Sequence, residues 1–306
     1  MPKDLHELPR LCDSISYISI EKAVIEQEDS SIVIVRDDGN IPVPVSSLTC
    51  LLLGPGTSIT HAAMKTIADN GCMVVWCGEN TSRFYASGMG ETRSADNLLL
   101  QAKLCMDSEA HMAVVRKMYE IRFPTVSTKG MTLQQIRGLE GIRVRETYKA
   151  ESKRTGVKWS GRDYKQTEWE DADDINKALS MSNVILYSVC HAAIISLGFS
   201  PGLGFIHTGK MLSFVYDIAD LYKAETTIPA AFEAVRDAKG NLEEKVKLYT
   251  RQKIAKARIL KRIADDIEKL FQTPMQEEHQ NRDDVGEIWD TDGRVTGGKN
   301  YGGDMM

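Results

Sequence analysis

The 306-residue sequence lacks several patterns that would define its function directly. Its six cysteines are scattered and none of them forms a CxxC pair, so neither a thioredoxin-like redox motif nor a two-pair zinc site is indicated. The amino terminus mixes charged residues with proline, and we find no apolar run of the length needed to cross a bilayer. These absences favour a cytoplasmic protein with reduced, mostly buried cysteines and no membrane partner.

The sequence also lacks the net positive charge that is typical of nucleic-acid-binding proteins, since its formal charge is −5. The acid is concentrated at one end, because residues 274–306 hold eight acidic and three basic side chains. The remaining body is therefore formally neutral, and local basic patches matter more than the total. The same segment has no hydrophobic periodicity, so we predict a disordered, flexible acidic tail over 274–306.

The first ninety residues show the alternation that is typical of β-strands. Apolar and β-branched residues alternate in SISYISIEKAVI, SSIVIVRDDGNIPVPV, LTCLLLGPG, CMVVWCGEN and RFYASG, which are separated by polar or glycine turns. One helix is predicted among them, in THAAMKTIADNG, which has a threonine cap and a glycine stop. We therefore predict a small β-rich domain over 1–90, followed by a linker over 91–97.

After the linker, apolar residues recur three and four positions apart, which predicts an all-helical domain over 98–273. Thr132 and Gln135 form a capping box ahead of a helix that is expected to end near Arg154, before Gly156. Further helices are predicted over 175–197, 213–223 and, as one long amphipathic helix, 242–271. The predicted fold class is α+β, with a small amino-terminal β-rich domain, a larger all-α domain and the acidic tail.

Glu140 falls on the apolar stripe of its predicted helix, where a charge needs a partner. An ion pair with Arg137 or Arg143 explains it, and so does a metal-binding or catalytic role. Gly138 and Gly141 remove side chains on either side, which allows another backbone or a ligand to come close. Both interpretations stay open at this point.

His207 lies in the glycine-rich segment GFSPGLGFIHTGK between two predicted helices, where it is either a surface side chain or a ligand. In the following helix, Asp217 falls at the rim of the apolar face and Asp220 lies beyond it. The two carboxylates are either solvated or offered together to a cation. Mg²⁺ and Mn²⁺ take such oxygen ligands, and Mn²⁺ accepts imidazole more readily.

Two other motifs do not support a function. Residues 204–210 read GFIHTGK, which matches a phosphate-binding P-loop, but Met211 replaces the required Ser or Thr and no buried strand precedes the loop. Cys72 and Cys77 flank the buried-strand pattern MVVW and have no second pair nearby, so we expect core cysteines instead of zinc ligands.

Two stretches are rich in basic residues. Residues 245–262 hold eight basic side chains and no acidic one, and they include Lys247 and Arg251. A second stretch surrounds Glu140 and includes Arg137 and Arg143. Unmixed positive charge of this length fits a phosphate backbone better than mere solubility, so we predict that these residues bind DNA. A buried acid among phosphate-attracting residues is typical of a metal-dependent nuclease or integrase.

The sequence resembles the Cas-one (Cas1) integrase family of CRISPR adaptation, and in particular its type I-E branch. The resemblance rests on PGTSITHAA, RFYASG, QAKL, VVRKMYEIRF, RGLEGIRVR and GFIHTGKMLSFVYDIADLYK. It implies a metal-dependent endonuclease and integrase that joins prespacer 3′-hydroxyl ends to the repeat of a CRISPR array by transesterification. It also implies double-stranded DNA as substrate and a homodimer with the β-rich domain at its contacts. Two such dimers would join the small Cas-two (Cas2) protein in a heterohexamer of four and two subunits.

The resemblance further implies roles for individual residues. The ligands of Mg²⁺ or Mn²⁺ would be Glu140, His207 and Asp220. Neighbouring catalytic positions match Asp217, Tyr187 and Lys223. Contacts with the DNA backbone match Arg83, Arg162 and Lys210. Lys22 and Ser58 depart from the pattern, because better-known members carry a tyrosine and an arginine there, so the measurement of prespacer ends does not follow from the resemblance.

Two other functions are compatible with the same residues. The first is a stand-alone, structure-selective DNA nuclease, in which the metal activates water instead of a 3′-hydroxyl. The second is a non-catalytic DNA-binding scaffold, in which Glu140, His207 and Asp220 are structural polar residues.

Overall fold

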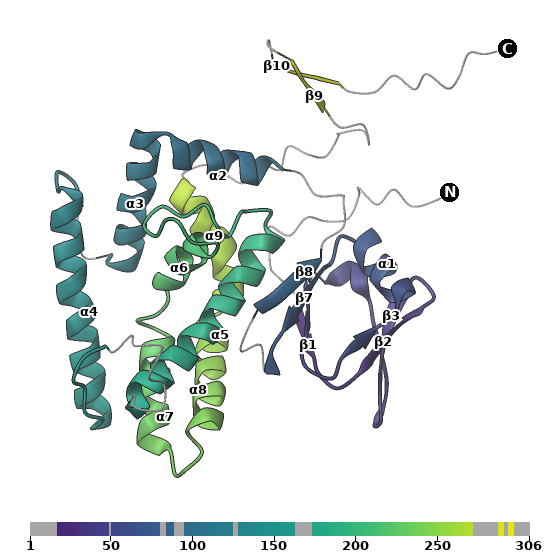
Figure 1. The fold of residues 1–306 in the computed structure, drawn as a ribbon, viewed down its shortest axis with the longest axis horizontal. Coiled ribbons are helices and arrows are strands. Elements are labelled where there is room, and N and C mark those ends of the chain that lie inside the picture. Colours follow the sequence, from purple (N-terminus) through teal and green to yellow (C-terminus); the bar gives the residue numbers. More distant parts are fainter. Residues whose placement is uncertain are drawn as a thin grey trace.

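The structure is a computed structural model that describes residues 17–48, 50–79, 84–88, 95–124, 128–162, 173–271, 287–290 and 293–296. Strands dominate the amino-terminal part and helices the part that follows (Figure 1). The first part contains β1 (Tyr17–Ile20), β2 (Val24–Glu28), β3 (Ser31–Arg36), β4 (Gly39–Val43), β5 (Cys50–Leu53), β6 (Ser58–Ile59), α1 (His61–Asp69), β7 (Met73–Cys77) and β8 (Phe84–Gly88). The second part contains α2 (Asp96–Met106), α3 (Ser108–Arg122), α4 (Leu133–Thr155), α5 (Asp174–Ser196), α6 (Ser213–Asp220), α7 (Thr227–Asp237), α8 (Leu242–Lys256) and α9 (Ile259–Phe271).

The strands form two four-stranded sheets, which confirms the predicted β-rich amino-terminal part. In the order β4-β3-β2-β6, the first three strands pair antiparallel and β6 joins β2 in parallel. In the order β1-β5-β7-β8, only the edge strand β8 is antiparallel to its neighbour. Apolar side chains of both sheets and of α1 share one core, which includes Ile20, Ile25, Ile32, Leu51 and Ile67.

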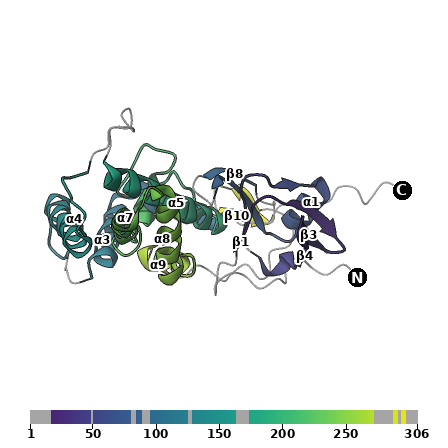
Figure 2. The same cartoon turned by 90° about the horizontal axis from the view of Figure 1, so that it is seen from below.

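The other face of the β1-β5-β7-β8 sheet packs against α5. Both views place α5 at the boundary between the two parts (Figures 1 and 2). A small apolar cluster fills this contact, formed by Cys50, Leu52, Met73, Val75, Cys77 and Ala192. The Phe84 ring lies against His191 of α5 with the ring centroids 3.6 Å apart. The two parts are therefore held together by buried apolar surface.

The cysteines agree with the prediction for the residues that the structure describes. Cys50, Cys72, Cys77 and Cys190 are buried, and Cys105 is partly buried. Burial raises the pKa of the Cys105 thiol to about 11, so it is protonated near neutral pH. Cys72 and Cys77 are core cysteines, as predicted.

The central helix of the second part is α5, which packs against α6, α7, α8 and α9. Its length and composition would suffice to cross a membrane, so the prediction that no segment reaches this limit was wrong. The error has a physical cause, because a helix surrounded by protein needs the same apolar composition as one surrounded by lipid. Most of α5 is buried within the protein, which is typical of a core helix.

The caps of α4 confirm its predicted boundaries. The Thr132 side chain accepts a hydrogen bond from the Gln135 backbone, and the Gln135 side chain accepts one from the Thr132 backbone. Gly156 follows the last turn with a φ of 77°, a left-handed conformation that glycine adopts without steric cost. The capping residues in the sequence therefore determine both ends of this helix.

The single helix predicted over 242–271 is wrong, because the structure divides it into α8 and α9 at Arg258, which has a φ of 51°. The buried side chains of α8 recur at Val246, Thr250 and Ile254. A continuous helix would place Arg258 next on this buried face. The break moves the register by one residue, so that Ile259 and then other apolar residues of α9 are buried instead.

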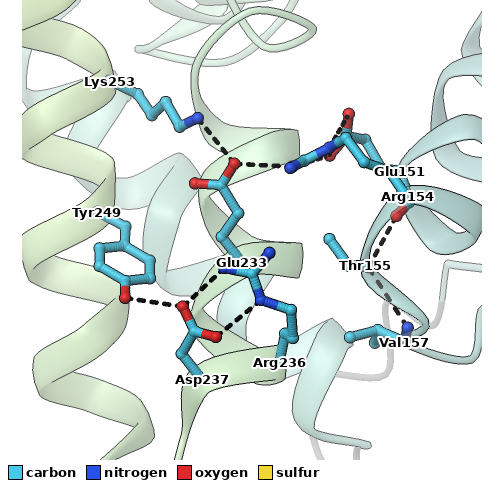
Figure 3. Close-up of polar contacts among 9 residues, drawn as sticks. All are labelled: Glu151, Arg154, Thr155, Val157, Glu233, Arg236, Asp237, Tyr249 and Lys253. Carbon is cyan, nitrogen blue, oxygen red and sulfur yellow. Dashed lines mark hydrogen bonds and ion pairs between the residues drawn. The ribbon is translucent and has the colours of Figure 1, made fainter.

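Ion pairs connect the carboxy-terminal end of α4 to α7 and α8 (Figure 3). Glu233 of α7 accepts hydrogen bonds from Arg154 of α4 at 2.8 Å and from Lys253 of α8 at 2.9 Å. Burial alone would raise the pKa of Glu233, but the two cations outweigh it and lower the pKa below its usual value. The carboxylate therefore stays charged near neutral pH and links three helices.

The acidic segment after α9 contains a short antiparallel hairpin of β9 (Glu287–Asp290) and β10 (Gly293–Thr296). Its strands were not predicted from the sequence, because the segment has no sustained alternation. The disorder predicted over 274–306 therefore does not apply to these two paired strands, and the rest of the tail lies outside the described residues. The domain boundaries at 90, 97 and 273 stay predictions, although α2 already begins at Asp96.

Candidate active site

His207 lies in the loop between α5 and α6, and Asp217 of α6 holds this loop from the inside. The buried Asp217 carboxylate accepts hydrogen bonds from the backbone N–H groups of Phe205, Ile206 and His207 at 2.6, 3.0 and 2.9 Å. Its Oδ1 atom also lies 2.7 Å from Nδ1 of the His207 ring. Asp217 is fully buried in this arrangement, so it positions His207 and has no surface left for a ligand of its own.

The Asp217 contact determines which part of the imidazole is available. The hydrogen bond to Asp217 raises the pKa of His207 above its usual value, although burial acts in the opposite direction and the Asp220 charge adds to the increase. Because Nδ1 faces Asp217, Nε2 is the nitrogen left to bind a ligand. Metal-binding histidines almost always donate their other ring N–H to a carboxylate, a backbone carbonyl or water, and Asp217 is such a carboxylate.

Two residues that the sequence analysis missed support the same loop. Gln101 of α2 is fully buried, and its side-chain amide donates to the carbonyl oxygens of Ser200 at 3.0 Å and Leu203 at 2.8 Å. The Gln101 side-chain oxygen accepts from the Ser200 backbone at 2.7 Å. His111 of α3 lies with Nε2 2.7 Å from the carbonyl oxygen of Phe205. The segment QAKL contributes Gln101, but a single sequence does not show that its partners lie a hundred positions away.

Gly204 is the glycine of this loop that the geometry requires. A β-carbon at this position would overlap the carbonyl oxygen of His207 and the Ser213 residue at the start of α6. The loop can therefore turn back on itself, and bring His207 to Asp217, only without a side chain at position 204.

Glu140 forms an ion pair with Arg122 of α3, and this partner differs from the Arg137 or Arg143 that the structural interpretation named. The same guanidinium nitrogen of Arg122, Nη1, lies 3.7 Å from Oδ2 of Asp220. Glu140 and Asp220 are eighty residues apart in the sequence, yet each has a carboxylate oxygen within 3.7 Å of Nη1 of Arg122. Arg122 therefore brings α3, α4 and α6 together at the candidate site.

Asp220 has a second cationic partner one helical turn later. Nζ of Lys223 lies 2.5 Å from Oδ1 of Asp220, but this buried oxygen accepts no hydrogen bond of ordinary geometry. Burial alone would lower the pKa of Lys223, but the negative charge of Asp220 outweighs it with help from Tyr187, so the pKa lies above its usual value. Lys223 is therefore a fixed positive charge beside the carboxylate at neutral pH.

Three rings connect the remaining parts of the site. The Lys223 ammonium lies 5.0 Å from the ring centroid of Tyr187 on α5, which is within cation–π distance. Tyr187 packs edge-on against Tyr216 at 5.0 Å, and Tyr216 packs edge-on against His207 at 5.8 Å. Tyr216 was also missed in the sequence, because it falls outside the apolar face of its predicted helix and carries no other signal there.

Glu140, His207 and Asp220 offer two carboxylates and an imidazole. Both Mg²⁺ and Mn²⁺ bind carboxylate oxygens, and Mn²⁺ accepts the imidazole nitrogen more readily than Mg²⁺ does. The donor groups of these three residues are therefore of the chemical types that bind a divalent cation. Oδ1 of Asp220 already contacts the Lys223 ammonium, so Oδ2, which faces the Glu140 side of the site, is the Asp220 oxygen that a divalent cation would meet. Among the residues that the structure describes, no three His, Cys, Asp or Glu side chains lie close enough together to hold one ion. Convergence of all three predicted ligands stays a prediction.

The predicted DNA-binding residues fall into two groups, apart from Arg83, which lies outside the described residues. Three of them are exposed: Arg137, Lys210 and Arg251. Three others make intramolecular contacts: Arg143 lies over the ring of Phe123, Arg162 donates to Asn176 and Ser180, and Lys247 pairs with Glu79 and Glu243. DNA contact stays a prediction for all seven.

The fold and the site together define a class: two-part proteins whose strand-rich amino-terminal part is followed by a helical part with a carboxylate and histidine site. The family model of the CRISPR associated protein Cas1 matches residues 16–125 and 122–257 of this chain. The chain belongs to the Cas1 family, as its resemblance predicted. Its assignment to the type I-E branch stays a prediction.

Individual relatives agree with this assignment. The chain is 48% identical over 307 residues to CRISPR-associated endonuclease Cas1 2 of Thermus thermophilus, covering 99% of this chain and 94% of the relative. It is 41% identical over 268 residues to CRISPR-associated endonuclease Cas1 of Escherichia coli K12, covering 87% and 88%. The crystal structure of a TtCas1-DNA complex matches with a TM-score of 0.79 at 50% identity, over 87% of this chain and 99% of that chain.

Proposed function

We propose that this protein is a metal-dependent DNA endonuclease and integrase of CRISPR adaptation, which joins prespacer 3′-hydroxyl ends to the repeat of a CRISPR array. The observation that carries the proposal is the meeting of Glu140 and Asp220 at Arg122, beside a histidine that Asp217 holds in place. Relatives named CRISPR-associated endonucleases and a relative crystallised with DNA support the same activity.

Glu140, His207 and Asp220 are the residues that would hold Mg²⁺ or Mn²⁺. When bound, the metal would polarise a phosphodiester and stabilise the leaving oxygen. The other residues keep this site ready: Asp217 fixes the ring of His207, and Lys223 supplies positive charge next to Asp220. Transesterification replaces one phosphodiester with another, so no nucleotide triphosphate is required, in agreement with the incomplete P-loop motif.

The wider assembly belongs to the same proposal. We expect a cytoplasmic homodimer that binds double-stranded DNA, and two such dimers with Cas2 in a heterohexamer of four and two subunits. The exposed cations Arg137, Lys210 and Arg251 are the first candidates for contacts with the DNA backbone, because phosphate contacts supply most of the affinity for DNA.

The test of the proposed function is strand transfer by a Glu140→Gln variant. A labelled prespacer duplex and a plasmid with a CRISPR repeat are incubated with the protein and Cas2 in Mn²⁺. The natural protein should join label to plasmid, and Glu140→Gln should reduce joining by about 100-fold or more, since even residues behind metal ligands contribute 10- to 100-fold. DNA affinity should change little, because basic residues supply it.

Glu146→Gln is the matched control, because it removes an exposed carboxylate from the same helix. It should retain full strand transfer. Cleavage without joining would identify a stand-alone nuclease instead of an integrase. A Glu140→Gln protein that still joins prespacer ends to the plasmid would contradict the mechanism. If the substitution lowered the stability of the protein without the expected loss of strand transfer, Glu140 would be a structural residue of a DNA-binding scaffold.

A further inference from the structure

The Arg122 side chain lies between the two candidate metal-binding carboxylates. Its Nη1 atom forms an ion pair with Glu140 and lies 3.7 Å from Asp220. The guanidinium is largely buried, with 12% of the side chain exposed, and its central carbon lies 5.3 Å from the ring centroid of Phe123. Arg122 thus holds a positive charge at the position between the carboxylates where a cation would bind both.

Lys223 has a different position. It contacts Oδ1 of Asp220, whereas Arg122 faces Oδ2 of Asp220 and the Glu140 carboxylate. A divalent ion between Glu140 and Asp220 would therefore meet the guanidinium first. The divalent ion and the Arg122 guanidinium cannot bind the same carboxylate oxygens, because two positive charges repel each other strongly at such distances.

We propose that Arg122 is an internal counter-cation that a divalent metal displaces from Glu140 and Asp220. This inference rests on the proposed metal site. Before metal binds, the guanidinium lies between two partly buried carboxylates that would otherwise repel each other, and together with Lys223 it balances their charges. It therefore stabilises the metal-free protein and, by competition, weakens the affinity for metal.

The test is a calorimetric titration with Mn²⁺ alone, combined with thermal unfolding with and without Mn²⁺. Arg122→Gln should unfold at a lower temperature than the natural protein without metal, and it should bind Mn²⁺ on the order of tenfold more tightly. Arg122→Lys keeps the positive charge, so its affinity for Mn²⁺ should be lower than that of Arg122→Gln and close to that of the natural protein. Lys117→Gln is the matched control, since it removes a cation of α3 that pairs only weakly, at 3.9 Å from Glu120.

Equal or weaker Mn²⁺ binding by Arg122→Gln would overturn the inference, because a competitor cannot be removed without increasing the affinity. Glu140→Gln and Asp220→Asn test the metal site separately: if neither weakens binding, the site itself is wrong. If Arg122→Gln does not fold, the natural protein crystallised with Mn²⁺ decides. A guanidinium that still contacts Glu140 beside the bound ion would then refute displacement.

Discussion

Asp217 shows at the scale of one residue how a buried carboxylate can organise a loop. It accepts three hydrogen bonds from consecutive backbone N–H groups and faces the ring of His207. A charge is expensive to bury unless it is fully hydrogen-bonded, and here every bond also fixes the position of the histidine. Arg122 acts in the same way between Glu140 and Asp220, with the signs reversed.

Asp217→Asn should lower the pKa of His207 toward its usual value. The main cause of the raised pKa is the hydrogen bond to Asp217, and an amide lacks the negative charge that favours the imidazolium. The variant should also lose about 2–4 kcal/mol of stability, because backbone donors lose a charged acceptor. An NMR titration of the His207 ring measures the pKa, and urea unfolding measures the stability. An unaltered His207 pKa would contradict the positioning role.

The residue types of the candidate site could be predicted from the sequence, but their partners could not. Glu140 on an apolar stripe already requires a cation, yet proximity in the sequence pointed to Arg137 and Arg143. The true partner, Arg122, lies on another helix, and only the tertiary packing of α3 against α4 and α6 brings it close. Gln101 and Tyr216 were missed for the same reason.

At the scale of the helices and strands, capping residues near in the sequence predict some helix ends, whereas tertiary packing determines others. Caps and glycine stops predicted α1 and α4 closely, because the hydrogen bonds that end a helix are made within a few residues. The break between α8 and α9 has no such signal, since neither glycine nor proline stands there. It is imposed by tertiary packing, which requires Ile259 on the buried face and leaves Arg258 exposed in a left-handed conformation.

Arg258→Gly should therefore stabilise the protein by about 0.5–1 kcal/mol. Arg258 has a φ of 51°, a conformation that costs an ordinary residue energy and costs glycine almost none. Lys256→Gly is the control two residues earlier, where α8 is still helical, and it should destabilise by about 1 kcal/mol. Urea unfolding of the three proteins distinguishes them. Equal losses in both variants would show that the backbone at Arg258 is not strained.

At the scale of the whole molecule, α5 connects the site with the strand-rich part. Tyr187 of this helix faces Lys223 at the candidate site, and His191, one turn later, lies against Phe84 of the edge strand β8. The same helix fills the core between α6, α7, α8 and α9. A change at the contact between the two parts therefore acts on a helix that also lines the site.

The contact between the two parts should make the stability depend on pH through His191. Burial lowers the pKa of His191 to about 4 from an ordinary value of 6.5, so the folded protein holds a neutral ring. The unfolded chain takes up a proton below about pH 6.5, whereas the folded protein does so only near pH 4. Stability that is present above pH 6.5 is therefore lost as the pH falls toward 4, by about 2 kcal/mol at pH 5.

A His191→Leu variant should lack this part of the pH dependence, because leucine does not titrate. Urea unfolding at pH 7 and pH 5 measures it, as the difference between the loss in the natural protein and the loss in the variant. His61→Gln is the control, since it removes an exposed histidine of α1 and should leave the natural loss unchanged. If His191→Leu lost as much stability as the natural protein, other groups would cause the acid sensitivity. If the difference is about 2 kcal/mol, mild acid weakens the buried contact that α5 makes with the edge of the sheet.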